Sequence, residues 1–226
     1  MNREEIQDQA AADLQEYVLK HQEEVLNHIV AFNELMNRYE AAIKEVSTKL
    51  EILKSDLKLH CKRDCITAIQ TRIKSPVSIF YKLNRRGLQV NLNNIRRELN
   101  DVAGIRVICS YIDDIYTVAE KLGSQDDIQV VLVKDYIQNP KPNGYRSYHM
   151  IVEVPVFFSD AKELLRVEIQ IRTVAMDFWA SLEHDMKYKK QIQDSEAIGR
   201  ELKECADTIS ETDRRMMDLR DRIQRD

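Results

Sequence analysis

The sequence predicts an α+β protein, in which a mixed β-sheet of four to five strands has flanking helices and long helical extensions at both ends. Three observations support this fold class. No Gly or Pro occurs before Pro76, so nothing obvious interrupts a helix in the first 75 residues. After Ile171 no Pro appears either. Between them lie short runs of β-branched and aromatic residues, which are typical of strands. We therefore expect three regions, 1–70, 71–190 and 191–226.

An apolar repeat of seven residues runs through the N-terminal region in steps of three and four. We call this repeat the N-terminal seam; its members are Val25, Ile29, Phe32, Met36, Tyr39, Ile43, Val46, Leu50, Leu53 and Leu57. The seam packs either against the chain's own core or against other copies of the chain, and we expect a mixture of both. A thinner apolar stripe follows in the C-terminal region. Both terminal regions are therefore candidates for oligomerisation.

The middle region contains the expected sheet. Four runs read as strands, at residues 102–111, 128–133, 148–156 and 165–171. Asp113 and Asp114 are expected to start a short helix that ends at Gly123, and residues 92–100 form another. Ser75-Pro76 opens a third helix, because Pro is favoured at the first helical position. We expect the helices to lie on one face of the sheet and at its two ends.

Composition excludes several classes of function. The chain carries 34 Lys and Arg against 38 Asp and Glu, a formal charge of −4, which argues against a general nucleic-acid binder. No run approaches the roughly 18 apolar residues of a membrane span. Four cysteines in 226 residues favour reduced thiols in a cytosolic protein. Cys61 and Cys65 have a spacing conceivable for a metal, but further ligands are not evident, so we expect ordinary helix positions.

Two basic segments are candidate binding sites for nucleotides. Residues 72–86 contain five cations and no acid, a candidate phosphate cradle whose alternative is a solvated basic face. Residues 134–149 combine further cations with tyrosines. Asn143-Gly144 permits a tight turn there, which presents Tyr145 at a loop-to-strand junction. An exposed tyrosine at such a place fits the flat face of a base.

A polar row on a central strand points to a catalytic site. In residues 165–172 the side chains of Val167, Ile169 and Ile171 face one way, while Glu168, Gln170 and Arg172 face the other. Such a row is costly unless it lines a site. Asp101 begins a neighbouring strand, and two carboxylates among cations suit Mg²⁺ bound to a nucleoside triphosphate. The alternative is that Glu168 pairs with an Arg on a half-exposed sheet.

Five segments together resemble the synthetase domain of the RelA/SpoT family, whose members make the alarmones ppGpp and pppGpp. They are RIKSPVSIFYKL, DVAGIRVIC, KDYIQNPKPNGYRSYH, VEIQIRT and MDFWASLEHDMKYK, in the family's order from Arg72 to Lys189. The third and fifth segments look most like the RelP branch of small alarmone synthetases. This resemblance implies a nucleotidyltransferase-like catalytic domain at 71–190, a cytoplasmic homotetramer built through the terminal helices, and no hydrolase or regulatory domain. Product activation is not expected, because CITAIQT lacks the Phe-x-Thr pattern associated with it.

The resemblance also implies a reaction, an ATP:GTP 3′-diphosphotransfer that yields pppGpp or ppGpp and AMP. Mg²⁺ would be held by Asp101 and Glu168, with Glu168 helping to deprotonate the acceptor's 3′-hydroxyl. The ATP-binding residues would be Arg72 and Arg106 on the adenine, and Lys74, Lys82 and Arg85 on the phosphates. Guanine would stack on Tyr145, and the other acceptor-binding residues would be Lys141, Arg146, His149 and Gln170.

Two other functions stay open at this point. Some small members of the family are toxins that pyrophosphorylate tRNA, although the acidity of this chain makes a nucleic-acid substrate or partner unexpected. A non-enzymatic, nucleotide-sensing helical scaffold is the second alternative, against which the paired carboxylates count. A P-loop kinase is excluded, because no Walker motif GxxxxGK[ST] is present. The preferred acceptor among GTP, GDP and GMP is left undetermined.

Overall fold

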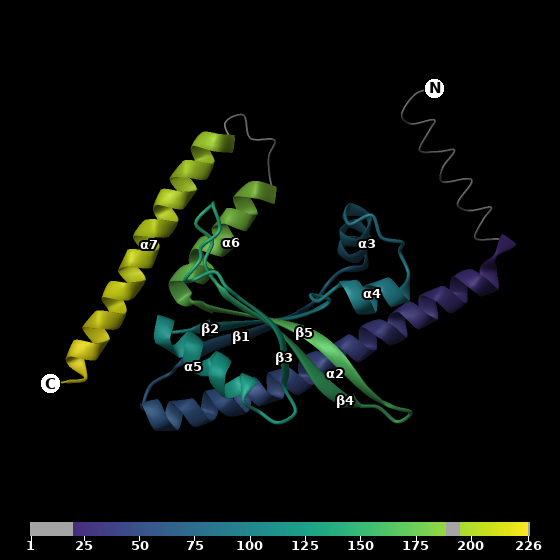
Figure 1. Cartoon of the computed structure of the whole chain (residues 1–226), viewed down its shortest axis with the longest axis horizontal. Helices are drawn as coiled ribbons and strands as arrows, with labels where there is room; N and C mark the ends of the chain where they lie inside the picture. The colour runs from purple at the N-terminus through teal and green to yellow at the C-terminus, as the bar shows by residue number, and fades with distance from the viewer. Residues whose placement is uncertain (1–19, 189–194, 226) are drawn as a thin grey trace. The chain divides into compact units, whose positions relative to one another are not determined.

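The computed structural model describes residues 20–188 and 195–225. The chain divides into two compact units. The boundary between them falls between Arg38 and Tyr39, inside the first described helix, α2 (Gln22–Cys61). The second unit carries the whole sheet and the remaining helices (Figure 1). In the described part of the chain, no helix is both long and apolar enough to cross a membrane.

The sheet has five strands in the order β1-β2-β5-β4-β3. Their bounds are Ile66–Ile73 for β1, Ala103–Cys109 for β2, Gln129–Asp135 for β3, Tyr148–Phe157 for β4 and Lys162–Thr173 for β5. Strands β2 and β5 run parallel, while every other neighbouring pair is antiparallel, so the sheet is mixed. The fold class is confirmed, and all four predicted strands are present.

Strand β1 corrects the prediction for the N-terminal region. Helix α2 ends at Cys61, and Lys62 adopts φ 52, a left-handed conformation that terminates a helix. Residues 66–70, which were expected to be helical, instead belong to an edge strand paired with β2. Cys65 is therefore not in a helix but is buried just before β1. The β-branched residues Ile66, Thr67 and Ile69 were a local signal for this strand, but the absence of Gly and Pro favoured a continued helix.

The core lies on one face of the sheet. Val167, Ile169 and Ile171 of β5 are fully buried there. Helix α5 (Ile112–Gly123) and the part of α2 after Arg38 lie on this side of the sheet (Figure 1). The members of the N-terminal seam from Tyr39 to Leu57 are all buried. Within this unit the seam therefore packs against the chain's own core, as one of the two interpretations predicted.

Helices also lie on the opposite side of the sheet, which corrects the expectation of a single covered face. These are α3 (Pro76–Arg85), α4 (Leu92–Glu98), α6 (Val174–Tyr188) and α7 (Ser195–Ile223) (Figure 1). The predicted start of α3 is confirmed, since Ser75 caps it by accepting a hydrogen bond from the Ser78 amide and Pro76 is its first residue. Helix α6 follows β5 without a loop, so the end of β5 and the start of α6 are held together.

Candidate active site

A row of polar side chains crosses the middle of the sheet on the face away from the core. In the strand register Arg106 pairs with Gln170, and His149 pairs with Gln170 from the other side. Gly104 lies opposite both Arg72 and Glu168. Directly paired residues share a face of the sheet, so residues from four strands converge here. The predicted alternation along β5 is confirmed. A cavity of about 100 Å³ opens between the polar side chains of β1, β2 and β5.

At Gly104 the neighbouring strand β1 leaves room for little more than a methyl group. A methyl group at this position would lie 3.4 Å from Cγ and 3.5 Å from Nε of Arg72. A larger side chain would therefore push Arg72 away from the cavity and would fill the space between Arg72 and Glu168.

Asp101 is the acidic group nearest to the basic segment on α3. Its Oδ2 accepts from Lys74 Nζ at 2.9 Å and from Lys82 Nζ at 2.6 Å. Burial opposes ionisation, but the hydrogen bonds and charges of Lys82 and Lys74 outweigh it and hold the pKa of Asp101 below its ordinary value. Its Oδ1 is buried and has no hydrogen-bond partner among the described residues. One oxygen of an ionised carboxylate is therefore left for a ligand.

Glu168 is the second carboxylate of the site. Burial raises the pKa of Glu168, whereas His149 and Gln170 lower it, and the net direction is downward. His149 Nδ1 lies 3.6 Å from Glu168 Oε1, and Gln170 donates to Oε2 at 3.0 Å. The negative charge of Asp101 acts in the opposite direction and raises the pKa of Glu168, but it does not reverse the net shift.

Asp101 and Glu168 are the candidate ligands for a metal ion. In residues 20–188 and 195–225, no group of three or more His, Cys, Asp or Glu side chains is placed to hold a metal ion. The unpartnered Oδ1 of Asp101 and the ionised Glu168 nevertheless offer hard oxygen ligands. Mg²⁺ is commonly bound by one or two carboxylates, with the rest of its coordination from substrate phosphates and water. The residues present therefore fit Mg²⁺ together with a nucleotide.

The loop before β4 presents Tyr145 as predicted. Gly144 has φ +87, which favours glycine, and Asn143 Oδ1 accepts from the Tyr145 amide at 3.3 Å. The hydroxyl of Tyr145 lies 2.8 Å from His149 Nε2. Lys141 Nζ lies 4.7 Å from the ring centroids of both Tyr136 and Tyr145. The Tyr145 hydroxyl is therefore linked to Glu168 through His149, and the ammonium group of Lys141 lies over the Tyr145 ring.

Arg172 and Asp177 are functional candidates that sequence reasoning did not assign. Arg172 is only 4% exposed; its Nη2 donates to Tyr145 Oη at 2.6 Å and to Gln170 Oε1 at 3.1 Å. Asp177 Oδ1 bridges Arg172 Nη1 at 3.1 Å and Arg106 Nη1 at 3.3 Å. The signal for Arg172 was its place at the end of the polar row. The role of Asp177 depends on how α6 lies on the sheet.

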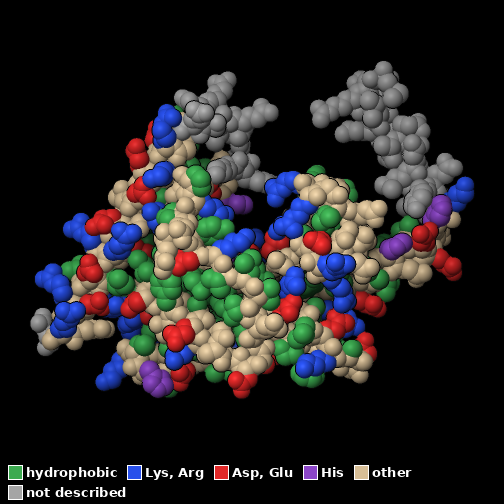
Figure 2. Space-filling view, viewed as in Figure 1, with side chains coloured by type: hydrophobic (Ala, Val, Ile, Leu, Met, Phe, Trp, Pro, Cys, Tyr) green, Lys and Arg blue, Asp and Glu red, His purple; other side chains and the backbone are tan. Residues whose placement is uncertain are grey.

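Two predicted ligand residues are not brought to the carboxylates. Arg85 is exposed in the last turn of α3. Several Lys and Arg side chains gather over the region of α3 and α4 on the face seen in Figure 2. Arg146 lies against α7, where its Nη2 pairs with Asp207 Oδ1 at 2.9 Å. In this structure a residue 61 positions further along the chain holds the guanidinium of Arg146, and the contact of Arg146 with the acceptor stays a prediction.

Comparison with known proteins places this site in a family. A family model described as a region found in RelA/SpoT proteins matches residues 71–193. The chain is 41% identical over 191 residues to the GTP pyrophosphokinase YwaC of Bacillus subtilis, covering 84% of this chain and 90% of that protein. It is 34% identical to YjbM of the same organism over 186 residues, covering 82% and 87% of the two chains.

Solved structures agree with this match. The small alarmone synthetase 1 of B. subtilis bound to its product pppGpp has a TM-score of 0.78 at 32% identity, covering 86% of this chain and 98% of the other. The small alarmone synthetase 2 of B. subtilis has a TM-score of 0.76 at 39% identity, covering 84% and 98%. The similarity therefore extends well beyond the matched central region.

Proposed function

Because the chain belongs to the RelA/SpoT family, we propose that it is a GTP pyrophosphokinase, which transfers the β,γ-diphosphate of ATP to the 3′-oxygen of GTP or GDP. The products are pppGpp or ppGpp, and AMP. The observation that carries this proposal is the pair of ionised carboxylates, Asp101 and Glu168, between two sets of cations and aromatic side chains. The relatives YwaC and YjbM are named GTP pyrophosphokinases, and each of the two alignments covers most of both chains.

ATP would occupy the side of the site formed by β1, β2 and α3. Arg72 and Arg106 flank the cavity and offer two planar guanidinium groups between which an adenine can stack. Lys74 and Lys82 already form ion pairs with Asp101, so their ammonium groups are in position to bind the phosphates of ATP. Arg85 lies on the same helix as Lys82 and would add its charge at the outer end of the triphosphate.

Asp101 and Glu168 would together hold Mg²⁺, which when bound neutralises phosphate charge and polarises the β-phosphorus. Asp101 would contribute its unpartnered Oδ1, because Oδ2 is already shared by two lysines. Glu168 reaches the same region from the adjacent parallel strand. The low pKa values of both groups keep them ionised at neutral pH, as a hard cation requires.

The guanine nucleotide would bind on the side formed by β4 and its preceding loop. Guanine stacks on Tyr145 after the ammonium group of Lys141, which lies over this ring, moves to the acceptor's phosphates. Gln170 and His149 flank Glu168 and would orient the ribose. With its proton on Nδ1, His149 accepts from the Tyr145 hydroxyl and donates toward Glu168.

The reaction needs positioning more than covalent catalysis. Glu168 takes the proton of the 3′-hydroxyl, whose oxygen attacks the β-phosphorus of ATP. The new bond joins this oxygen to the β-phosphorus, and the bond between the β-phosphorus and the bridging oxygen to the α-phosphorus breaks. That electron pair leaves with AMP. Lys74, Lys82 and the flanking arginines offset the negative charge that collects in the transition state.

Assembly and location follow from the same proposal. The α7 residues Met216, Leu219 and Ile223 are 52%, 47% and 75% exposed, and an apolar stripe of this kind is stabilised by burial against another subunit. We therefore propose a homo-oligomer, a tetramer by resemblance. The proposed substrates are cytoplasmic nucleotides, so we propose the cytoplasm as its location.

Product identification tests the function directly. The purified protein is incubated with Mg²⁺, γ-labelled ATP and either GTP, GDP, GMP or deacylated tRNA, and the products are separated by thin-layer chromatography. We expect label in a guanosine 3′-diphosphate product and release of unlabelled AMP. Label in tRNA alone would identify the toxin-type activity instead. Nucleotide binding with no transfer to any acceptor would support the scaffold alternative.

A further inference from the structure

Helix α7 lies directly against the loop that carries Tyr145. A methyl group on Gly144 would lie 2.5 Å from Cβ of Ala206 and 3.3 Å from Cα of Lys203, so the loop backbone touches the helix with no space to spare. Trp179, Ala180 and Ala206 form a buried apolar cluster between α6 and α7, and Tyr145 packs against this cluster. The ring proposed to bind guanine therefore rests partly on the C-terminal helix.

Arg146 fastens the same loop to α7 by polar contacts. Its Nη1 donates to the carbonyl oxygen of Gly144 at 3.0 Å and to that of Ala206 at 3.3 Å. Its Nη2 pairs with Asp207 Oδ1 at 2.9 Å. The Arg146 side chain is 13% exposed, so it is largely enclosed between loop and helix. It bridges the residue before Tyr145 and one turn of α7.

Helix α7 is itself fixed to the catalytic domain along its length. Near its start, Trp179 Nε1 donates to the carbonyl oxygen of Leu202 at 2.9 Å. In the middle, the Thr173 hydroxyl donates to Asp213 Oδ2 at 2.5 Å, at the junction of β5 and α6. A support anchored at both of these points does not move freely relative to the loop.

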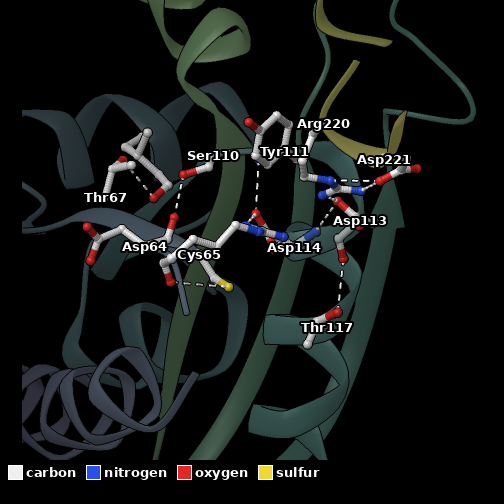
Figure 3. Close-up of polar contacts among 12 residues, drawn as sticks. Asp64, Cys65, Thr67, Ser110, Tyr111, Asp113, Asp114, Thr117, Arg220 and Asp221 are labelled. Atoms are coloured by element: carbon white, nitrogen blue, oxygen red, sulfur yellow. Dashed lines mark hydrogen bonds and ion pairs between the residues drawn. The ribbon is translucent and has the colours of Figure 1, made fainter. Parts of the chain in front are cut away.

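The far end of α7 is anchored by a layered cluster (Figure 3). Arg220 pairs with Asp113 at 2.8 Å, and its guanidinium carbon lies 4.5 Å from the ring centroid of Tyr111. Arg63 also stacks on Tyr111, at 5.0 Å, and pairs with Asp114 at 2.7 Å. Charged groups of both signs and an aromatic ring thus join α7 to the start of α5.

From these contacts we propose that α7 is part of the acceptor site, and that Arg146 and Asp207 are positioning residues that hold Tyr145 in place for the guanine nucleotide. This rests on the proposed function, and it deepens that function by making acceptor affinity depend on the C-terminal helix. A competing arrangement has Arg146 leaving Asp207 to bind the acceptor's phosphates. The two arrangements make opposite predictions for Asp207.

The test compares Arg146→Ala, Asp207→Asn, the double variant and wild type, with KM for GTP, KM for ATP and kcat measured for each. Removing either partner is expected to raise KM for GTP about three- to tenfold, the scale of one lost hydrogen-bonded pair, with KM for ATP and kcat within about twofold. The double variant should match the single ones, and Arg146→Lys should recover part of the loss. If Asp207→Asn leaves KM for GTP unchanged or lowers it while Arg146→Ala raises it, the positioning proposal is wrong.

Two controls separate the possible failures. Lys203 pairs with the other oxygen of Asp207 at 2.6 Å, so Lys203→Ala, which leaves Arg146 in place, should keep the wild-type KM for GTP. A threefold rise in that control would show that Asp207 acts through Lys203 and would overturn the proposal. Calorimetric titration with GTP gives the same comparison without turnover. An inactive wild type would refute the proposed function, whereas active variants with wild-type GTP affinity would refute only the role of α7.

Discussion

At the scale of single residues, each carboxylate of the site has cationic or donor groups already placed around it. Lys74 and Lys82 contact one oxygen of Asp101, and His149 and Gln170 contact Glu168. Ordinarily a buried carboxylate is costly to ionise, so these partners are what keep both groups charged. Arg172 extends the same network by joining Tyr145 to Gln170 and Asp177.

Replacing either carboxylate with its amide should act on the chemical step. We expect Asp101→Asn and Glu168→Gln each to lower kcat by at least about 10²-fold, the scale of losing a transition-state electrostatic partner. Turnover is measured with labelled ATP, and folding by circular dichroism. Asp127→Asn removes a carboxylate that pairs with Lys49 away from the site, so it should retain wild-type kcat. Near-normal turnover in either site variant would contradict the roles assigned to the two carboxylates.

Tyr145 should separate stacking from hydrogen bonding. Tyr145→Ala is expected to cost about 1–3 kcal/mol in guanine-nucleotide affinity, the usual range for a base stacked on an aromatic ring. Tyr145→Phe keeps the ring but removes the hydroxyl that lies on Arg172 and His149, so we expect it to retain most acceptor affinity while losing about 0.5–1.5 kcal/mol of stability. Titration and urea denaturation measure the two effects. A change confined to ATP affinity would place the nucleotides in the opposite pockets.

At the scale of elements, helices determine how charged groups reach the site. The Ser75 cap and Pro76 start α3 so that Lys82 in its last turn reaches Asp101. Helix α7 reaches the end of β5 through Asp213, a carboxylate that is only 6% exposed. Burial raises the pKa of Asp213, and the hydrogen bond from Thr173 only partly offsets this. An ionised Asp213 is therefore a cost to the folded state.

Asp213→Asn should stabilise the protein near neutral pH. Since the folded state binds the Asp213 proton more tightly than the unfolded state, stability falls as pH rises above the ordinary value of 3.8, and the penalty is complete above the folded pKa. The amide can still accept from Thr173 but carries no charge. We expect a higher Tm than wild type at pH 7, with the difference shrinking as the pH approaches 4. The exposed Asp218→Asn should stay within about 0.5 kcal/mol of wild type throughout. A lower Tm for Asp213→Asn at pH 7 would mean that the hydrogen bond outweighs the cost of burial.

At the scale of the whole molecule, the apolar residues of the terminal regions have two different roles. From Tyr39 to Leu57 the N-terminal seam is buried in the catalytic unit. The α7 residues Met216, Leu219 and Ile223 remain exposed. Self-association therefore stays a prediction for α7 and for the part of the seam before Tyr39, whereas the rest of the seam stabilises the fold.

Charges placed on these two surfaces should have different consequences. Val46 is 0% exposed, so Val46→Asp, alone or with Ile43→Asp, is expected to unfold the chain, because it buries an unpaired charge. Met216→Asp with Leu219→Asp should instead shift the mass toward smaller species while the Tm changes little. Light scattering and thermal melting measure the two effects, with Glu211→Ala on the same helix as the control. A wild-type protein that is monomeric at micromolar concentration would refute the oligomer.

The sequence by itself determined most of the local structure and the centre of the site. Runs of β-branched and aromatic residues identified four strands, alternation predicted the polar row of β5, and Ser75-Pro76 marked the start of α3. Asp101 was expected where one strand begins and Glu168 on its neighbour; Asp101 lies just before β2, and β2 and β5 are indeed parallel neighbours. The strands, the polar row and the start of α3 depend on residues that are close in sequence, so composition and spacing were enough to predict them.

Only the tertiary structure decided the features that depend on distant segments. Residues 66–70 contain no Gly or Pro to end a helix, but hydrogen bonding to β2 makes them an edge strand. The sequence predicts that Arg146 binds phosphate, yet its guanidinium pairs with the carboxylate of Asp207, 61 positions away. Arg106 and Asp177 meet because α6 folds back onto the polar face of the sheet. Side-chain direction at such places is set by packing between elements, and packing has no local signature in the chain.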